Sequence, residues 1–278
     1  MRLEFCKMQG LGNDFLVFDA PSGFRGRPLD PAMIRRLADR HLGVGFDQAL
    51  MLEPPREAGQ RVFYRVFNAD GGEVEQCGNG ARCVAALVHA RDPGLGPEFL
   101  MASPGGPVRA RILDPDRISV EMGVPDFDPR ALPMEAPREA LLYPLTIEDT
   151  TVQVGAVSMG NPHVVLEVED VDQAPVERLG PLLERHRAFP RRTNVGFLQI
   201  HDRRHVSLRV FERGVGETLA CGTGTCAAVA VGRHRGLLDA QVEVALRGGR
   251  AEVRWPGEGE PLWLTGPATV VFTGSIEI

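Results

Sequence analysis

The chain of 278 residues contains little lysine, no long apolar run and no cluster of basic residues. Without a basic cluster, and with a net charge of −6, it lacks the pattern typical of a nucleic-acid-binding surface. No apolar run approaches membrane-spanning length, and the N-terminal residues resemble a strand rather than the apolar segment of a signal peptide. We therefore expect a cytoplasmic protein with no membrane or nucleic-acid partner.

Lysine is represented only by Lys7, since all other basic residues in the count of 31 Lys plus Arg are arginines. A pyridoxal-phosphate enzyme needs a lysine for its Schiff base. Lys7 lies in an expected strand, with no phosphate-cradling loop beside it. The sequence therefore argues against this cofactor.

Cysteine is also sparse, and the five residues are an odd number in a chain too long to need disulfides for its stability. This composition favours free thiols in a reducing compartment. Neither the cysteine spacing nor the seven histidines form the C-x₂-C or H-E-x-x-H patterns of zinc sites. We expect no metal, and we expect Cys6, Cys83 and Cys226 to be buried and inert.

Two of the cysteines begin similar segments, CGNGARCVAA at 77–86 and CGTGTCAAVA at 221–230. Each segment places a cysteine and glycines before small and apolar residues, a pattern typical of a loop that enters a buried helix. The free N–H groups and dipole at a helix N-terminus favour the thiolate form of a cysteine there. A buried structural thiol would explain one such segment, but the repetition favours a functional pair, Cys77 and Cys221.

Other positions repeat at the same separation of 221 − 77 = 144 residues. Gly12-Asn13 and Gly160-Asn161 repeat at a separation of 148. The chain is therefore interpreted as a tandem duplication with an α/β (α+β) fold of two pseudo-symmetric domains. We expect one domain at 1–121 with a returning strand at 267–278, and the other at 122–266. The positions that repeat at 144 are Phe67 and Phe211, Gly72 and Gly216, Glu73 and Glu217, and Gly80 and Gly224.

Local patterns predict the elements of both copies. Asp30 and Pro31 mark the start of a first helix that ends before Gly43, and Pro181 interrupts a third. The proline-rich segment 123–144 is expected to be irregular. Helices are expected at 31–42, 77–92, 175–186 and 221–235, and strands at 2–8, 15–19, 49–52, 61–67, 108–113, 118–122, 151–157, 163–168, 195–200, 206–211 and 268–278.

Two thiols at one cleft could form a redox dithiol, a nucleophile with a helper, or a pair of bases on opposite faces of one carbon. A redox pair is usually C-x-x-C, and a nucleophile needs a histidine base. The symmetry favours two bases, which invert a stereocentre when a thiolate removes a proton and a thiol returns one. The N–H groups of Gly78, Asn79, Gly222 and Thr223 are then expected to stabilise the developing carboxylate charge.

Distinctive motifs occur in both halves, namely KMQGLGNDF at 7–15, GFDQ at 45–48, NADGGEVEQCGNGARC at 68–83, MGNPH at 159–163, TNVGF at 193–197 and VFERGVGETLACGTGTCAA at 210–228. In these motifs the sequence resembles the diaminopimelate epimerase family. The resemblance implies a mixed β-sheet wrapped around a central helix in each domain, and a cofactor-independent homodimer that interconverts LL- and meso-2,6-diaminopimelate for lysine and peptidoglycan synthesis. One of Cys77 and Cys221 would be the base and the other the acid.

The resemblance also assigns roles to residues around the thiols. His163 and Glu212 occupy the positions that tune the two thiols. Arg213 would hold the distal carboxylate with a bidentate fork, and Glu212 would hold an ammonium. The full set of implied substrate contacts is Asn13, Gln48, Asn68, Gly78, Asn79, Asn161, Asn194, Glu212, Arg213, Gly222 and Thr223.

Two other functions remain open from the sequence. One is a different cofactor-independent amino-acid racemase or epimerase, similar to proline racemase, which would keep both cysteines but would not need Glu212 and Arg213 for a distal zwitterion. The other is a non-enzymatic thiol redox or binding protein, which would exchange no α-proton from any amino acid.

Overall fold

The computed structural model describes residues 2–20, 29–92, 94–136 and 138–277. The chain divides into two compact units, Met1–Val120 with Thr265–Ile278, and Glu121–Leu264. The sequence placed these divisions at 121/122 and 266/267. β8 (Arg117–Glu121) and β17 (Trp263–Gly266) contain the residues at which the chain passes from one unit to the other.

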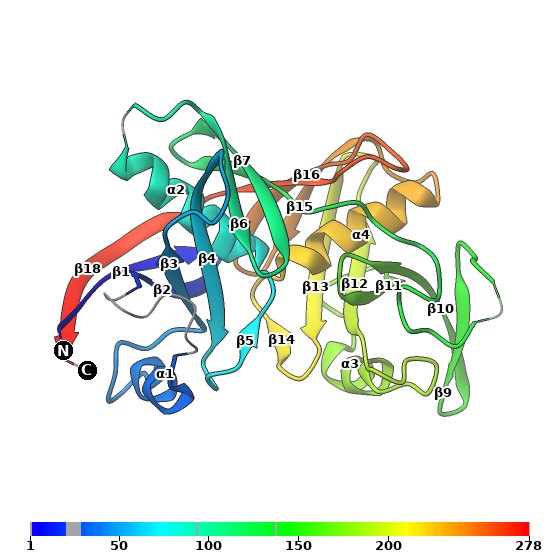
Figure 1. Ribbon diagram of the computed structural model, residues 1–278. Helices are drawn as coiled ribbons and strands as arrows, with labels where there is room; N and C mark the ends of the chain where they lie inside the picture. Colours follow the sequence, from blue (N-terminus) through cyan, green and yellow to red (C-terminus); the bar gives the residue numbers. More distant parts are fainter. Residues whose placement is uncertain (1, 21–28, 93, 137, 278) are drawn as a thin grey trace. The chain divides into compact units, whose positions relative to one another are not determined.

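The first unit is a mixed sheet around one helix (Figure 1). Its strands pair in the order β18-β1-β2-β3-β4-β6-β7-β8, with β2/β3 and β4/β6 parallel and the other pairs antiparallel. Helix α2 packs against β1, β2, β3, β4 and β7. Its further elements are β1 (Arg2–Gly10), β2 (Asn13–Asp19), α1 (Pro31–Ala38), β3 (Gln48–Glu53), β4 (Gln60–Asn68), β5 (Glu73–Val74), α2 (Gly78–Arg91), β6 (Glu98–Ser103), β7 (Gly106–Asp114) and β18 (Thr269–Glu277).

The second unit repeats this plan. Its strands pair in the order β9-β10-β11-β12-β13-β15-β16, with β11/β12 and β13/β15 parallel. Helix α4 packs against β10, β11, β12, β13 and β16. The duplication predicted from the cysteine segments is therefore confirmed. The elements are β9 (Tyr143–Ile147), β10 (Thr150–Ser158), β11 (Pro162–Glu167), α3 (Val176–Glu184), β12 (Asn194–Ile200), β13 (His205–Glu212), β14 (Gly216–Thr218), α4 (Gly222–His234), β15 (Gln241–Leu246) and β16 (Gly249–Arg254).

Small side chains allow the two central helices to lie inside their sheets. In α2 every residue from Gly78 to Ala85 is buried, and nearly the whole of α4 is buried. A Cβ atom on Gly80 would lie 3.0 Å from a Leu50 methyl, and one on Gly224 would lie 3.2 Å from the Val210 methyls. Because these glycines are equivalent in the repeat, both helices approach their strands in the same way.

The outer helices α1 and α3 complete the cores. Ile34 and Leu37 of α1 pack with Leu16, Met51 and Phe67 of the sheet. In the second unit, Leu179 and Leu183 of α3 belong to one cluster with residues of β9 to β12. Each sheet is therefore covered on one face by its central helix and on the other by a shorter helix.

The structure corrects two helix predictions, the end of α1 and the interruption of α3. Helix α1 ends at Ala38 rather than before Gly43, because the Asp39 carboxylate accepts hydrogen bonds from the N–H groups of His41 and Leu42 at 2.7 and 2.8 Å. Helix α3 runs through Pro181 without a break. Proline removes one N–H donor there, and the buried face of the helix compensates for that loss.

Several strands escaped the sequence analysis, namely β5, β6, β9 and β14 to β17. Strand β9 begins at Tyr143 and alternates between buried and exposed residues, although the segment up to residue 144 was expected to be irregular. The predicted burial of Cys6, Cys83 and Cys226 is confirmed, since each is at most 4% exposed. Among the described residues, no helix has the length and hydrophobicity needed to cross a bilayer.

The close approach of β10 to α4 gives a test of this packing. A Cβ atom on Gly155 would lie 2.2 Å from Val231 Cγ1, so Gly155→Ala overpacks the core and should reduce the free energy of unfolding by about 1–3 kcal/mol. Urea unfolding measures this change. The double variant Gly155→Ala/Val231→Ala should recover part of the loss, whereas Gly96→Ala, with no atom within 4 Å of its Cβ, should be neutral. A neutral Gly155→Ala would contradict the packing described here.

Candidate active site

The two cysteines cap the central helices of their units. Cys77 is the N-cap of α2 and Cys221 is the N-cap of α4, and both have extended backbones. The Cys221 sulfur accepts a hydrogen bond from the N–H of Gly224 at 3.4 Å. The predicted position of each thiol at a helix start is therefore confirmed, with the first free N–H groups of each helix beside it.

Asn13 lies beside Cys77 in the first unit. Its Oδ1 lies 3.9 Å from Cys77 Sγ and 3.4 Å from Nδ2 of Asn79. On the adjacent strands, Gln48 donates through Nε2 to Asn68 Oδ1 at 2.8 Å, because these residues are paired in the β3–β4 register. The structure therefore groups Asn13, Asn79 and Cys77, and separately groups Gln48 with Asn68.

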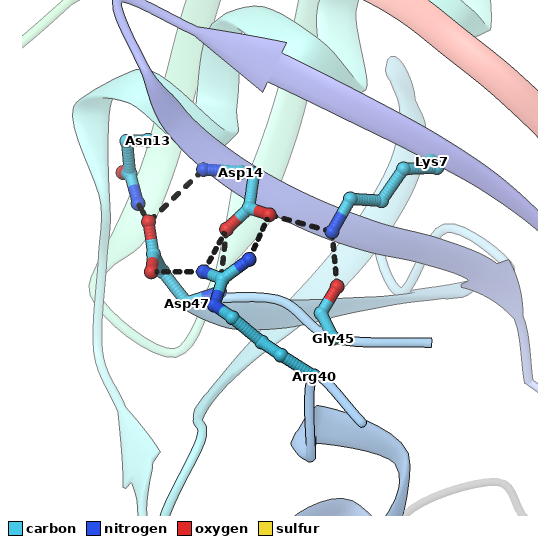
Figure 2. A network of polar contacts seen from close by, with 6 residues as sticks. All are labelled: Lys7, Asn13, Asp14, Arg40, Gly45 and Asp47. Atoms are coloured by element: carbon cyan, nitrogen blue, oxygen red, sulfur yellow. Dashed lines mark hydrogen bonds and ion pairs between the residues drawn. The ribbon is translucent and has the colours of Figure 1, made fainter. Parts of the chain in front are cut away.

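A network of charged side chains holds Asn13 in place (Figure 2). Asn13 donates to Asp47 at 2.9 Å, and Arg40 forms ion pairs with both Asp47 and Asp14 at 2.8 Å. Burial opposes the ionisation of Asp14, but hydrogen bonds from Arg40 and Lys7 outweigh it and hold the pKa of this carboxyl below its ordinary value. The segment that carries Asn13 is thereby fixed to the loop that precedes Gln48.

The only lysine belongs to this network. Lys7 is 7% exposed, and its Nζ donates to Asp14 at 2.6 Å and also to the carbonyl oxygen of Gly45. These bonds hold the ammonium in the β1–β2 region and give Lys7 a structural role.

The surroundings of Cys221 differ from those of Cys77. The hydroxyl of Thr223 lies 3.5 Å from Cys221 Sγ, and Asn161 donates to this hydroxyl at 3.4 Å. Nε2 of His163 lies 3.0 Å from Oδ1 of the same asparagine. The second unit thus places Asn161 between the histidine and the threonine that contacts the thiol.

The pKa of the Cys221 thiol is raised well above its usual range, first by burial and then by the negative charge of Glu212. Hydrogen bonds from Thr223 and Gly224 act in the opposite direction and offset only part of the increase. The helix N-terminus alone predicts a reactive thiolate, and burial with Glu212 outweighs that effect here. Cys221 is therefore a protonated thiol at neutral pH in this structure.

His163 is neutral over the physiological range. Burial lowers its pKa to about 3, and the positive charge of Arg213 adds to the decrease. The ring is 1% exposed and contacts Asn161. It therefore acts through hydrogen bonding rather than through charge.

The remaining predicted contacts lie at the ends of β12 and β13. Asn194 accepts the backbone N–H of Arg213 at 2.9 Å and donates to the carbonyl of Pro162 at 3.0 Å. The Arg213 side chain is exposed and donates to the carbonyl of Arg191 at 3.3 Å. Glu212 accepts the Thr218 hydroxyl at 2.5 Å. The backbone of Arg213 is thus fixed while its guanidinium is accessible to an anion.

An ion pair stabilises the β4–β5 hairpin before Cys77, and an equivalent pair stabilises the β13–β14 hairpin before Cys221. The sequence analysis identified the glutamate of each pair but not the arginine. Arg65 pairs with Glu73 at 2.6 and 2.5 Å, and Arg209 pairs with Glu217 at 2.7 and 3.0 Å. The sequence analysis identified the two glutamates only as positions that repeat at 144. Their partners could have been found from the same spacing, because 209 − 65 = 144.

Among the described residues, no group of three or more His, Cys, Asp or Glu side chains is placed to hold a metal ion.

Comparison with known proteins identifies the family and the fold of the chain. The sequence profile of diaminopimelate epimerase matches residues 5–127 and 155–271. Curated diaminopimelate epimerases from Nitrosomonas europaea and Laribacter hongkongensis are each 52% identical to the chain, over 100% of both sequences. The matched region spans both cysteine segments of the chain.

Solved structures with low identity share the fold. A hydroxyproline epimerase from Agrobacterium vitis has a TM-score of 0.70 at 14% identity, covering 99% of this chain and 92% of its own. A phenazine biosynthesis protein from Bacillus anthracis has a TM-score of 0.68 at 17% identity and full coverage of both chains. The matching profile and the full-length relatives identify the chain as an epimerase, a type of isomerase. The cysteine at the N-cap of each central helix agrees with this class. The chain belongs to the diaminopimelate epimerase family.

The neutral His163 predicts a loss of stability in acid. Its pKa is about 3 in the folded chain against an ordinary value of 6.5, so only the unfolded chain gains a proton as the pH falls between these values. The free energy of unfolding should therefore decrease below pH 6.5, by at most about 1.4 kcal/mol per pH unit from this residue. Urea unfolding at pH 7 and pH 5 should show a smaller decrease for His163→Gln than for the wild type. Equal decreases would contradict the burial of a neutral imidazole.

Proposed function

We infer that the chain interconverts LL- and meso-2,6-diaminopimelate without a cofactor, as a cytoplasmic homodimer that supplies lysine and peptidoglycan synthesis. The observation that carries this proposal is a cysteine at the N-cap of each central helix, in a chain that matches diaminopimelate epimerases over its whole length. Cys77 and Cys221 act on opposite faces of the same α-carbon. One thiolate removes the proton, and the other thiol returns one.

Substrate binding at Glu212 activates one of the thiols in this proposal. The carboxylate charge of Glu212 is a cause of the raised pKa of Cys221. A substrate ammonium at Glu212 compensates that charge, which leaves the Thr223 hydroxyl and the Gly224 N–H to stabilise a Cys221 thiolate. Cys221 is then the base when the complex forms, and Cys77 is the acid. The roles exchange in the reverse reaction.

The starts of the two helices stabilise the charge that builds on the substrate carboxylate. The first helical hydrogen bonds join Ala81 N to Cys77 O and Thr225 N to Cys221 O, at 2.8 and 2.9 Å. The N–H groups of residues 78, 79, 222 and 223 precede these bonds and lie in the first turn of each helix, where the helix dipole favours an anion. Donors already in place cost no reorganisation when the α-carbon loses its proton.

Recognition of the distal end separates this substrate from simpler amino acids. The exposed guanidinium of Arg213 binds the distal carboxylate, and Asn194 fixes its backbone. Gln48, Asn68 and Asn161 contribute amide donors and acceptors for the two zwitterionic ends. An enzyme for proline would have no distal zwitterion to bind, so the proposal favours diaminopimelate.

Deuterium exchange tests the reaction. The reduced protein, incubated in deuterated water, should incorporate α-deuterium into diaminopimelate with change of configuration and should not label proline. Cys77→Ala and Cys221→Ala should each lower epimerisation by about 100-fold or more, because each removes one of the two proton-transferring groups. The control Cys226→Ala removes a thiol inside α4, away from the cap, and should keep turnover. Exchange into proline but not into diaminopimelate would overturn the proposal.

The homodimer is supported by strand β18, which pairs with β1 and carries exposed apolar side chains. Val270, Val271 and Phe272 are about half exposed, at 50%, 55% and 47%. Adjacent residues of a strand point to opposite faces, so both faces of β18 present apolar surface. A second copy of the chain would cover this surface.

A charge on β18 should therefore weaken the dimer. Phe272→Asp places a carboxylate in the proposed interface and should shift the protein toward the mass of one chain in sedimentation velocity experiments, by raising the dissociation constant at least about tenfold. Leu113→Asp, at a residue of β7 that is 50% exposed, is the matched control and should leave the mass unchanged. If the wild type sediments as a single chain, this part of the proposal is wrong.

A further inference from the structure

A line of polar side chains passes the Cys77 sulfur in the first unit. Arg82 donates through Nη2 to Asn79 Oδ1 at 3.0 Å, and Asn79 donates through Nδ2 to Asn13 Oδ1 at 3.4 Å. Asn13 in turn donates through Nδ2 to Asp47 Oδ2 at 2.9 Å. The oxygen of Asn13 that accepts from Asn79 is the atom 3.9 Å from the sulfur.

The two ends of this line allow only one direction of hydrogen bonding. A guanidinium has donors and no acceptor, so Asn79 must turn its oxygen toward Arg82. A carboxylate has acceptors and no donor, so Asn13 must turn its NH₂ group toward Asp47. The two ends therefore require the same pair of amide orientations, and the Asn13 amide is held most directly by Asp47, at 2.9 Å. Arg82 is fully buried, and Asp47 also accepts from Arg40 at 2.8 Å and from the N–H of Asp14 at 3.1 Å.

We propose that Arg82 and Asp47 are positioning residues that fix the amide orientations of Asn79 and Asn13, so that a carbonyl oxygen faces the Cys77 sulfur. This inference deepens the proposed epimerase and rests on Cys77 being one of its two acid–base groups. A carbonyl oxygen accepts from a thiol and repels a thiolate, whereas the reversed amide would donate to the thiolate. The line therefore favours Cys77 as the proton donor.

The second unit has neither end of the line. The residue equivalent to Arg82 is Cys226, since 82 + 144 = 226, and the residue equivalent to Asp47 is Thr193, by the spacing of 146 between Gln48 and Asn194. Cys221 instead contacts the Thr223 hydroxyl, the Gly224 N–H and the Glu212 carboxylate. The two duplicated thiols thus have different partners, an amide oxygen oriented by the line at Cys77, and a carboxylate together with two donors at Cys221.

Two titratable groups that interact with Cys77 carry no charge at neutral pH. Tyr64 and Cys83 both interact electrostatically with Cys77. Burial raises the pKa of Tyr64 above its ordinary value and raises the pKa of Cys83 to about 12, so both are uncharged. Arg82 keeps its charge but directs its Nη2 donor to Asn79.

Alkylation of the thiols without substrate tests the line. Asp47→Ala removes the shorter of the two hydrogen bonds that orient the Asn13 amide, at 2.9 Å against 3.4 Å for the bond from Asn79, so the NH₂ group can turn toward Cys77 and stabilise the thiolate. The rate of Cys77 alkylation by iodoacetamide at pH 7, followed by mass spectrometry across a pH series, should rise about three- to tenfold. Cys221 in the same sample should react as in the wild type.

Two controls separate amide orientation from loss of a negative charge. Glu98→Ala removes a carboxylate from an ion pair with Arg111 in the same unit and should leave Cys77 unchanged. In about 1 M salt the long-range effect of the Asp47 charge is screened, while a local amide contact is retained. An increase that disappears at this salt concentration, or an unchanged Cys77 profile in folded Asp47→Ala, would overturn the proposal.

Neutron diffraction on the deuterated wild-type protein gives a second measurement that depends on no variant. Deuterons on the Asn13 atom that faces Asp47 are the expected result, and deuterons on the atom that faces Cys77 would overturn the proposal. Neither measurement uses diaminopimelate. A wild-type protein that fails to exchange this substrate would therefore refute the epimerase function and leave the amide orientation to be decided separately.

Discussion

Burial of a helix inside its own sheet is the constraint on which the rest of the structure depends. Strands contact α2 and α4 on several sides, so their first turns have room only for small residues. Gly80 and Gly224 already lie near the limit of contact with neighbouring strands. Since the helix cannot shift, its N-cap cysteine and the free N–H groups behind it have a fixed place in each unit. The packing of the core therefore sets the geometry of the chemistry.

The two units are more alike in the ion pairs that hold the cysteine hairpins than in the polar contacts next to the sulfurs. The ion pairs Arg65–Glu73 and Arg209–Glu217 occupy the same place in both units and brace the hairpins that lead to the cysteines. The atoms next to the sulfurs differ, because one thiol faces an asparagine oxygen and the other a threonine hydroxyl. The fold requires only that both helices be held, and it leaves the polar contacts next to each sulfur to differ.

Electrostatics in the second unit depends on burial more than on the helix dipole. The dipole and the Gly224 N–H favour a thiolate at Cys221, yet desolvation and Glu212 together outweigh them. Burial has the corresponding effect on His163, which is kept neutral. Both groups change protonation only when their surroundings change, and a substrate ammonium beside Glu212 is such a change in the proposed reaction.

The sequence by itself determined the duplication, the helix starts at the two cysteines and the family, because these are carried by spacing and by local glycine and capping patterns. Strands such as β5 and β14 have only two and three residues and form through their neighbours, so only the tertiary structure decided them. The same holds for the partners of Asn13, since Asp47 and Asn79 are distant from it in sequence and meet it only through strand pairing and helix burial. Hydrogen-bond direction and desolvation arise from three-dimensional neighbours, and for that reason the unequal surroundings of the two thiols could not be read from two similar sequence segments.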